Sequence, residues 1–234
     1  MKTKSFLFLS ILAVLFICCS GNVEYPETFK SETSGGYLYN EDDLIKVYYE
    51  NDKLFLNWRG GKIEPVVLSQ NEFFVADMYK KFKFVQHPKT KARYLSVISE
   101  DDPANTTYDY LKVPKGYKTP SLYLKEGNYD KALEGYLKIK AKDSTSHFID
   151  EWDFNSMGYG YIRKHQYPKA IEILKINAAL HPNSANVYDS LGEAYMLNGN
   201  DREAYINFKK TLEIYPENKK AKRFVKANKD KFEN

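Results

Sequence analysis

The chain has 234 residues, of which 43% are hydrophobic and 28% are charged, and its formal net charge is +4. This composition predicts a folded chain with a hydrophobic core. It excludes a polytopic membrane protein, a collagen and, because there are only two cysteines, a disulfide scaffold. The excess positive charge lies at the two ends, with seven basic and three acidic residues in 217–234, so no nucleic-acid-binding face is predicted across the fold.

The N-terminus has the pattern of an export signal. Lys2 and Lys4 precede an apolar run over 6–19 that is interrupted only by Ser10. A membrane-spanning helix needs roughly 20 apolar residues, so this run is too short for a convincing span. A basic start followed by a short apolar run is typical of a signal peptide.

Both cysteines lie where this run ends, in Leu15-Phe16-Ile17-Cys18-Cys19-Ser20-Gly21. This segment resembles the lipobox of bacterial lipoproteins, in which the signal peptide is cleaved just before a cysteine that carries the lipid. The resemblance implies a signal peptide over 1–18, an acyl anchor (palmitate) on Cys19, with Cys18 as the alternative, and a place in the bacterial cell envelope at the outer membrane. An ordinary cleaved signal peptide or a membrane anchor is the competing interpretation. The polar residues 19–36 are expected to form a flexible tether.

Residues 37–113 predict a small antiparallel β-domain. Short alternating runs follow one another, separated by turn compositions such as Glu50-Asn51-Asp52-Lys53 and Gly60-Gly61. The predicted strands lie around 45–49, 54–58, 63, 66–68, 73–75, 82–85, 94–98 and 108–111. A barrel or a strongly curved sheet is expected, since closure removes exposed edges.

Three short motifs give this β-domain a further resemblance: Gly36-Tyr37, Lys53-Leu54-Phe55-Leu56 and Asn71-Glu72-Phe73-Phe74. They resemble the accessory domain that follows penicillin-binding-type (beta-lactamase-related) serine hydrolase domains. The Ser-x-x-Lys and Gly-x-Ser-x-Gly motifs of serine hydrolases occur nowhere in the chain. The resemblance therefore implies an accessory module without its catalytic domain.

After a linker at 114–119, residues 120–216 show an internal period of 34 residues. Seven residues recur at this spacing: Phe154, Met157, Gly158, Tyr161, Ala170, Leu174 and Pro182 become Tyr188, Leu191, Gly192, Tyr195, Ala204, Phe208 and Pro216. Period and residue types resemble the tetratricopeptide repeat, a pair of helices A and B. The fold predicted for the whole chain is therefore an α+β multidomain protein, a small antiparallel β-barrel or curved sheet followed by an α-helical solenoid.

The solenoid is predicted to hold one partial repeat and two full repeats, followed by a cap. The partial repeat matches at a spacing of 38, with helix A over 121–126 and Gly127 to Ala132 opening helix B. Residues 217–234 predict a basic capping helix, because an apolar stripe containing Phe224 and Val225 alternates with lysines at helical spacing. Its basic face is interpreted as a solvated surface, with attraction to acidic lipid headgroups or to an acidic partner as the alternative.

The predicted function is binding rather than catalysis. By the resemblance, the A helices present a partner groove lined by Asn155, Tyr159, Arg163, Asp189, Glu193 and Leu197. We expect a non-catalytic envelope lipoprotein that binds a protein or peptide there, with no cofactor and no nucleic acid. The alternatives are a detached accessory module of a serine hydrolase system and small-ligand binding in the β-domain. A groove that the β-domain covers, or that is merely solvated, is an equally open interpretation.

Other chemical signals are weak. The four histidines show no metal-binding spacing, and the acidic runs 41–43 and 100–102 lack the glycine and the downstream glutamate of a calcium loop, so no metal site is predicted. Asp143-Ser144-Thr145 resembles the acceptor motif of O-glycosylated envelope proteins, which makes Ser144 a candidate glycosylation site.

Overall fold

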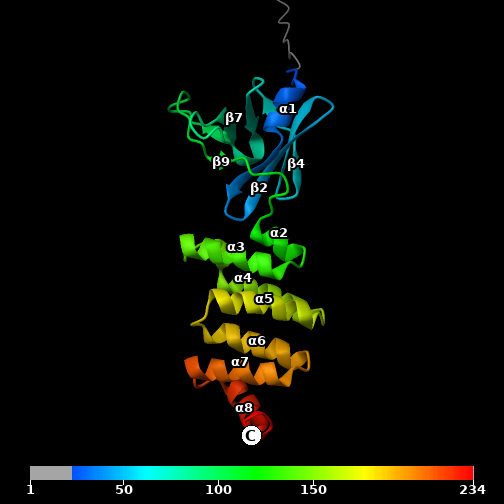
Figure 1. Cartoon of the computed structure of the whole chain (residues 1–234), viewed down its shortest axis with the longest axis vertical. Helices are drawn as coiled ribbons and strands as arrows, with labels where there is room; N and C mark the ends of the chain where they lie inside the picture. Colours follow the sequence, from blue (N-terminus) through cyan, green and yellow to red (C-terminus); the bar gives the residue numbers. More distant parts are fainter. Residues whose placement is uncertain (1–22, 234) are drawn as a thin grey trace, which may run out of the picture.

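The structure is a computed structural model that describes residues 23–233. It is elongated, with a β-domain at one end and a stack of helices running from it to the other end (Figure 1). The predicted signal peptide, Cys18 and Cys19 lie outside the described residues. The predicted fold class, antiparallel sheet followed by a helical solenoid, is confirmed.

The β-domain consists of two antiparallel sheets. The first has the order β1-β2-β3-β4 and the second β5-β6-β7-β8-β9. The strands are β1 (Gly35–Asn40), β2 (Asp43–Glu50), β3 (Lys53–Trp58), β4 (Gly61–Ile63), β5 (Val66–Val67), β6 (Glu72–Val75), β7 (Lys80–Gln86), β8 (Arg93–Ile98) and β9 (Tyr110–Leu111), with a short 3₁₀ helix η1 (Ala76–Met78) before β7. Of the two predicted alternatives the curved sheet is right, since the described strands do not close into a barrel.

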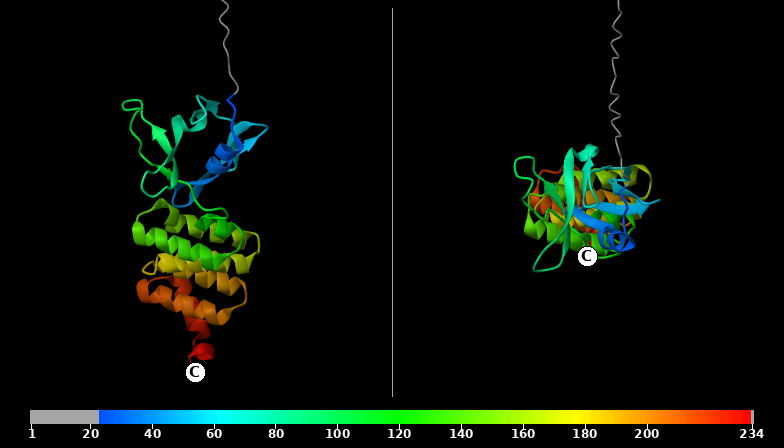
Figure 2. Two further views of the ribbon diagram at one scale, coloured as in Figure 1. Left: turned by 45° about the horizontal axis from the view of Figure 1, so that its top comes forward. Right: turned by 90° about the horizontal axis from the view of Figure 1, so that it is seen from above.

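The two sheets diverge like the sides of a V and share one aromatic core (Figure 2). They meet at one edge, where Tyr37 of β1 bridges Lys112 just after β9. Tyr37, Phe73 and Phe82 are almost fully buried between them. Because each strand alternates inward and outward residues, the period of two in the sequence is enough to assign this core.

The prediction of a flexible tether up to residue 36 is wrong for its described part. Residues Glu27–Thr33 form helix α1, which lies between the two sheets, and Gly35 already begins β1. Tyr25 and Thr33 are buried, and Tyr25 packs on the ring of Phe29 at 5.8 Å between centroids. Aromatic residues at 25 and 29 lie on one side of the segment and bury it against the sheets, which outweighs its polar composition.

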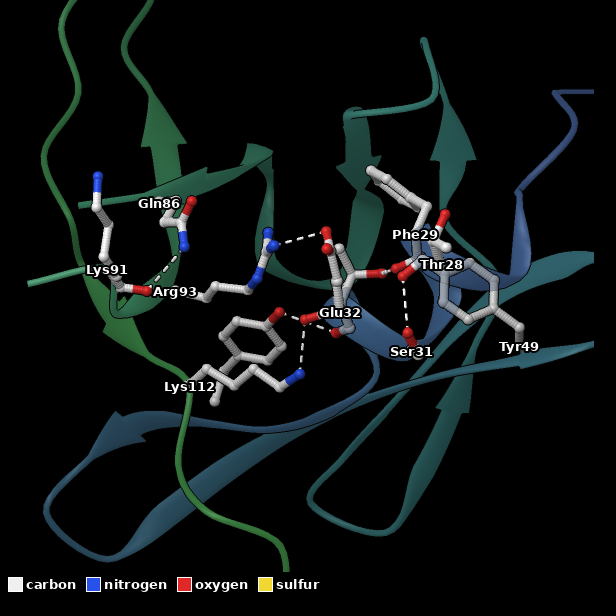
Figure 3. Close-up of polar contacts among 11 residues, drawn as sticks. Thr28, Phe29, Ser31, Glu32, Tyr49, Gln86, Lys91, Arg93 and Lys112 are labelled. Carbon is white, nitrogen blue, oxygen red and sulfur yellow. Dashed lines mark hydrogen bonds and ion pairs between the residues drawn. The ribbon is translucent and has the colours of Figure 1, made fainter. Parts of the chain in front are cut away.

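Polar contacts fix the C-terminal end of α1 between the sheets (Figure 3). Glu32 is paired with Arg93 of β8 at 2.5 Å, and its carbonyl oxygen accepts a hydrogen bond from Lys112 at 2.6 Å. The Tyr37 hydroxyl donates to the carbonyl oxygen of Thr33 at 2.8 Å, so both sheets hold the helix.

The helical region stacks antiparallel helices in the order of the sequence (Figure 2). The helices are α2 (Pro120–Lys125), α3 (Tyr129–Lys142), α4 (Glu151–Arg163), α5 (Tyr167–Leu180), α6 (Ala185–Leu197), α7 (Asp201–Ile214) and α8 (Lys219–Phe232), with a 3₁₀ helix η2 (His147–Ile149) before α4. Helices α2, α4 and α6 are the A helices, α3, α5 and α7 the B helices, and α8 is the cap. The insertion that lengthens the first spacing to 38 lies in the α3–α4 connection.

Each A helix ends in the same turn, with a residue in the left-handed backbone region two positions beyond the helix. These residues are Gly127 (φ +79°), His165 (φ +56°) and Gly199 (φ +80°). After each of them the next amide bonds back to a carbonyl five residues earlier, as from Gln166 to Tyr161. This is a Schellman turn, in which a side chain at the left-handed position is unfavourable.

His165 is therefore the strained member of the three turns. We expect His165→Gly to raise the free energy of unfolding by about 0.5–1 kcal/mol, with the exposed bond between His165 and the Tyr167 hydroxyl offsetting part of the gain. Gly199→Ala is the reciprocal control and should lower it by about 1 kcal/mol, since an added Cβ meets nothing within 4 Å and only the backbone is strained. Urea titrations measure both. Equal stability of the three proteins would contradict this interpretation of the turns.

The β-domain joins the first repeat through the turn between β1 and β2. The Asp42 carboxylate accepts hydrogen bonds from the Ser121 amide at 2.7 Å and from the Tyr136 hydroxyl at 3.3 Å. Burial raises the pKa of Asp42, against the effect of these hydrogen bonds. Beside it, Glu41 pairs with Lys142 at 2.6 Å. The acidic run 41–43, where no metal site is predicted, thus joins the β-domain to the first repeat.

Candidate functional site

The predicted partner residues lie on one side of the solenoid, formed by α4, α6 and the start of α8. We call this surface the A-helix face. It comprises Trp152, Asn155, Tyr159, Arg163, Asp189, Glu193, Leu197 and Lys220. The 34-residue repeat generates it, since equivalent positions of successive A helices lie side by side.

The middle of the A-helix face is a closed polar cluster. The Tyr159 hydroxyl donates to a Glu193 carboxylate oxygen at 3.0 Å. Lys220 of α8 pairs with Asp189 at 2.7 Å and with Glu193 at 2.5 Å, and Asn218 donates to Asp189 at 3.1 Å. Burial alone would lower the pKa of Lys220, but the hydrogen bonds to the two carboxylates outweigh it and the pKa is raised. The two predicted acidic residues are therefore already paired within the chain.

Two predicted residues form the floor of this face rather than an exposed contact. Asn155 is only 7% exposed, and its side-chain oxygen has no hydrogen-bond partner among the described residues. Tyr159 is half-buried, and burial raises the pKa of its hydroxyl. The main chain of a bound peptide could donate a hydrogen bond to the unsatisfied Asn155 side-chain oxygen only if the Asn155 side chain turned outward.

The exposed part of the face lies on α4 and at the end of α6. Trp152 is 73% exposed and Leu197 is 40% exposed. Arg163 is exposed at the C-terminal end of α4 and forms no ion pair among residues 23–233. Trp152 lies in the first turn of α4 and Arg163 in its last, and exposed tryptophan and arginine residues are both enriched in binding hot spots. The structure therefore moves the candidate contacts toward Trp152, Arg163 and Leu197.

Trp152 and Lys220 were missing from the site predicted from sequence. The repeat carries a signal that locates them, because Asn186 follows Trp152 by 34 residues and Lys220 follows Asn186 by 34. All three occupy the second position of their helices. Extending the 34-residue period into the cap helix therefore identifies Trp152 and Lys220. The groove positions implied by the resemblance did not include these two residues.

The β-domain does not cover the A-helix face. Its polar contacts with the described helices involve α2 and α3, through Glu41 and Asp42. Helix α2 has only six residues, whereas α4 and α6 have thirteen each. The short first A helix leaves the first turn of α4, with Trp152, open to solvent.

Two cavities lie outside this face. One of about 450 Å³ lies between the β-domain and the first repeat, lined by Tyr117, Tyr123 and lysines of α3 among others. Another, of about 850 Å³, lies in the β-domain beside the start of the described chain, and Tyr25 lines it. The Tyr25 hydroxyl is buried and has no hydrogen-bond partner among the described residues. Among the acidic residues lining this second cavity, Glu27 and Asp52 pair with Lys30, and Glu64 pairs with Lys53.

Neither a metal-binding group of side chains nor a membrane-spanning helix is found within residues 23–233. No group of three or more histidine, acidic or cysteine side chains is placed there to hold a metal ion. None of the described helices combines the length and the apolar character that crossing a bilayer requires. Ser144 is exposed in the turn after α3, where Asp143 accepts hydrogen bonds from Thr145, and its glycosylation stays a prediction.

Comparison with known proteins finds similarity for the helical region. No family model matches the chain, and no curated protein matches it. Among solved structures, the R50E mutant of MamA is 24% identical, with a TM-score of 0.38, and the match covers 48% of this chain and 79% of MamA. The first tetratricopeptide domain of Spaghetti (RPAP3) bound to an HSP90 peptide is 21% identical, with a TM-score of 0.34, over 48% of this chain and 86% of that one.

A third structure has a similar extent of overlap. It is the Yersinia enterocolitica secretion chaperone SycD in complex with a peptide of YopD, 17% identical, with a TM-score of 0.34, over 48% of this chain and 88% of that one. These similarities concern the fold alone. The assignment of a tetratricopeptide-like solenoid rests on the repeat period and the helix pairs of this chain.

Proposed function

We propose that the protein is a non-catalytic adaptor that binds a protein or peptide on its A-helix face. The observation that carries the proposal is the exposure of Trp152 and of the unpaired Arg163, at the two ends of α4 on a surface that the β-domain leaves open. A large rigid aromatic side chain supplies apolar contact area, and a free guanidinium pairs with a carboxylate or a chain terminus in a bidentate manner.

The lipobox resemblance supports the second part of the proposal, an envelope lipoprotein anchored by Cys19, or alternatively by Cys18. In this arrangement the β-domain lies nearest the membrane and the solenoid projects from it, since the described chain begins in the β-domain and the helices follow (Figure 1). Mass spectrometry of the N-terminal peptide tests it. An unmodified Cys19 and Cys18, or cleavage elsewhere, would contradict it.

The binding proposal is tested with full-length protein in a pull-down from envelope extract. We expect Trp152→Ala with Arg163→Glu to reduce recovery of the partner by at least about 30-fold, the effect of losing a hot-spot contact. Tyr159 is a poorer probe, since its removal would leave Glu193 without one of its hydrogen bonds.

The matched control also changes one exposed aromatic residue and one exposed arginine, on the B-helix side of the solenoid. Tyr215→Ala with Arg202→Glu removes an exposed aromatic ring and reverses an exposed arginine at the two ends of α7. This control should retain the partner. A partner recovered equally by both double variants would exclude the A-helix face as its binding site.

The cavity in the β-domain supports one other candidate function, the binding of a small ligand. The buried, unpartnered Tyr25 hydroxyl and the volume of about 850 Å³ favour it. Native mass spectrometry of the purified full chain would reveal a bound molecule. Resemblance to the hydrolase accessory domain leaves a third alternative, a subunit of a serine hydrolase system.

A further inference from the structure

Helix α8 is the last element of the solenoid and lies at the end of the molecule opposite the point where the described chain begins (Figures 1 and 2). One side of α8 closes the core. Ala221 is fully buried, and the ring of Phe224 packs on Phe208 of α7 with centroids 5.0 Å apart. The opposite side of the helix therefore faces away from the protein.

That outward side carries a row of cations, which we call the cap face. It comprises Lys219, Arg223 and Lys226, at the spacing of four and three residues that places them on one side of a helix, with Lys222 and Lys229 beside them. All are exposed. Each of the five is a cation within one helix turn of another, so the face concentrates positive charge.

The three central cations have no partner among residues 23–233. Other cations of α8 do have one: Lys220 pairs with Asp189 and Glu193, Lys222 with Glu217, and Lys231 with Asp201. Lys219, Arg223 and Lys226 make no ion pair and no hydrogen bond through their side chains there. The neighbouring residues thus neutralise the flanks of α8 but not its outer face.

The B helices show how this chain builds a surface that is merely solvated. They pair lysine with glutamate one turn away, in Lys138–Glu134, Lys175–Glu172 and Lys210–Glu213. Like charges one turn apart destabilise a helix, whereas opposite charges stabilise it. A cap needs only a polar outer face. Here three cations follow one another at one-turn spacing and Asp230, one turn after Lys226, is the acidic residue of the row, so the row carries a repulsion that an anionic partner would relieve.

We propose that the cap face binds an anionic phospholipid surface, which in the lipoprotein arrangement is a different surface from the membrane that anchors Cys19, because α8 lies at the opposite end of the molecule. The charges of the cap face lie in a line on the convex outer side of a terminal helix, which suits a flat array of headgroups better than a peptide that needs a groove. The larger apolar residues of α8 lie on its packed side, so the contact is electrostatic and does not insert into the bilayer. This proposal does not rest on the adaptor function.

The experiment captures the full chain on a sensor surface through a tag at its N-terminus and passes lipid vesicles over it. We expect vesicles with about 30% phosphatidylglycerol to bind and vesicles of phosphatidylcholine alone not to bind through this face. The bound fraction should fall by about tenfold or more between roughly 50 mM and 500 mM salt, since the Debye screening length shortens to a few ångströms at the higher concentration. Any contribution of the N-terminal segment, with Lys2 and Lys4, is common to the wild type and the variants and cancels when they are compared on the same vesicles.

The test variant is Lys219→Glu, Arg223→Glu, Lys226→Glu, which should weaken binding of the anionic vesicles by about 100-fold or more. The control variant is Lys125→Glu, Lys164→Glu, Arg202→Glu, which makes the same substitutions at exposed cations elsewhere on the solenoid that also lack ion pairs among the described residues. It has the same net charge and should bind the anionic vesicles nearly as wild type does. Circular dichroism confirms that both variants fold.

Equal loss in both triple variants would overturn the proposal and indicate a response to net charge alone. Retained binding in the cap-face variant would overturn it as well. A final measurement compares the binding of soluble polyglutamate with the binding of the anionic vesicles. If polyglutamate binds the cap face as tightly as the vesicles do, at equal anion concentration, the partner is an acidic polypeptide and the phospholipid assignment is wrong.

Discussion

Gly158→Ala is expected to lower the free energy of unfolding by up to about 2 kcal/mol, although alanine favours a helix more than glycine does. A Cβ at position 158 would lie 2.7 Å from both Cγ and Cδ2 of Leu174, which is fully buried. Overpacking of this kind costs about 1–3 kcal/mol, and the gain in helix propensity of about 1 kcal/mol offsets only part of it.

Gly160→Ala, two residues further along α4, is the matched control. A Cβ there meets only the end of the Arg163 side chain, at 3.9 Å. The same substitution should therefore raise the free energy of unfolding by about 0.5–1 kcal/mol. Guanidinium titration of both variants measures the difference. Changes of the same sign in the two variants would show that close packing of α4 on α5 does not decide the stability of this repeat.

Unfolding in alkali is the second large effect that we expect. Burial raises the pKa of Tyr49 to about 12, and burial also raises the pKa values of Tyr37 and Tyr136 well above the ordinary value of 10. An unfolded chain releases these protons near pH 10, while the folded chain keeps them. The stability they contribute is complete below pH 10 and is lost as the pH rises through 12, at up to about 1.4 kcal/mol per pH unit for each tyrosine.

Circular dichroism between pH 9 and 12, with tyrosinate absorbance as a second probe, measures this loss. Tyr37→Phe should lower the slope of stability against pH above pH 10, although it also removes the hydrogen bond to Thr33. Tyr79→Phe removes a hydroxyl from a side chain that is 84% exposed and serves as the control. An unchanged slope in Tyr37→Phe would contradict the assignment of the alkaline transition to buried tyrosines.

Periodicity decided how much of the fold could be predicted. The alternation of Ile45, Val47 and Tyr49 gives β2, and the 34-residue repeat gives α4 to α7, because in both cases local spacing alone determines which side is buried. Helix α1 could not be predicted this way. It is seven residues long, and its stability comes from packing between two sheets that are distant in sequence.

In the candidate site, too, the repeat predicts some contacts and not others. The repeat correctly brought Tyr159 and Glu193 together across two helices. It could not show that Lys220 neutralises Asp189 and Glu193, because that pairing depends on how the cap helix docks. It also could not show that Asp42 reaches α2, since side-chain contacts between domains leave no period in the sequence.

Because α1 is held between the sheets, the first buried residue within 23–233 is Tyr25 rather than a residue near 36. In the proposed lipoprotein only six peptide units separate Cys19 from Tyr25. Whatever conformation they take, they span at most roughly 20 Å. The β-domain would then lie close to the lipid headgroups. The length of the solenoid, rather than that of the tether, would determine how far the protein extends from its membrane.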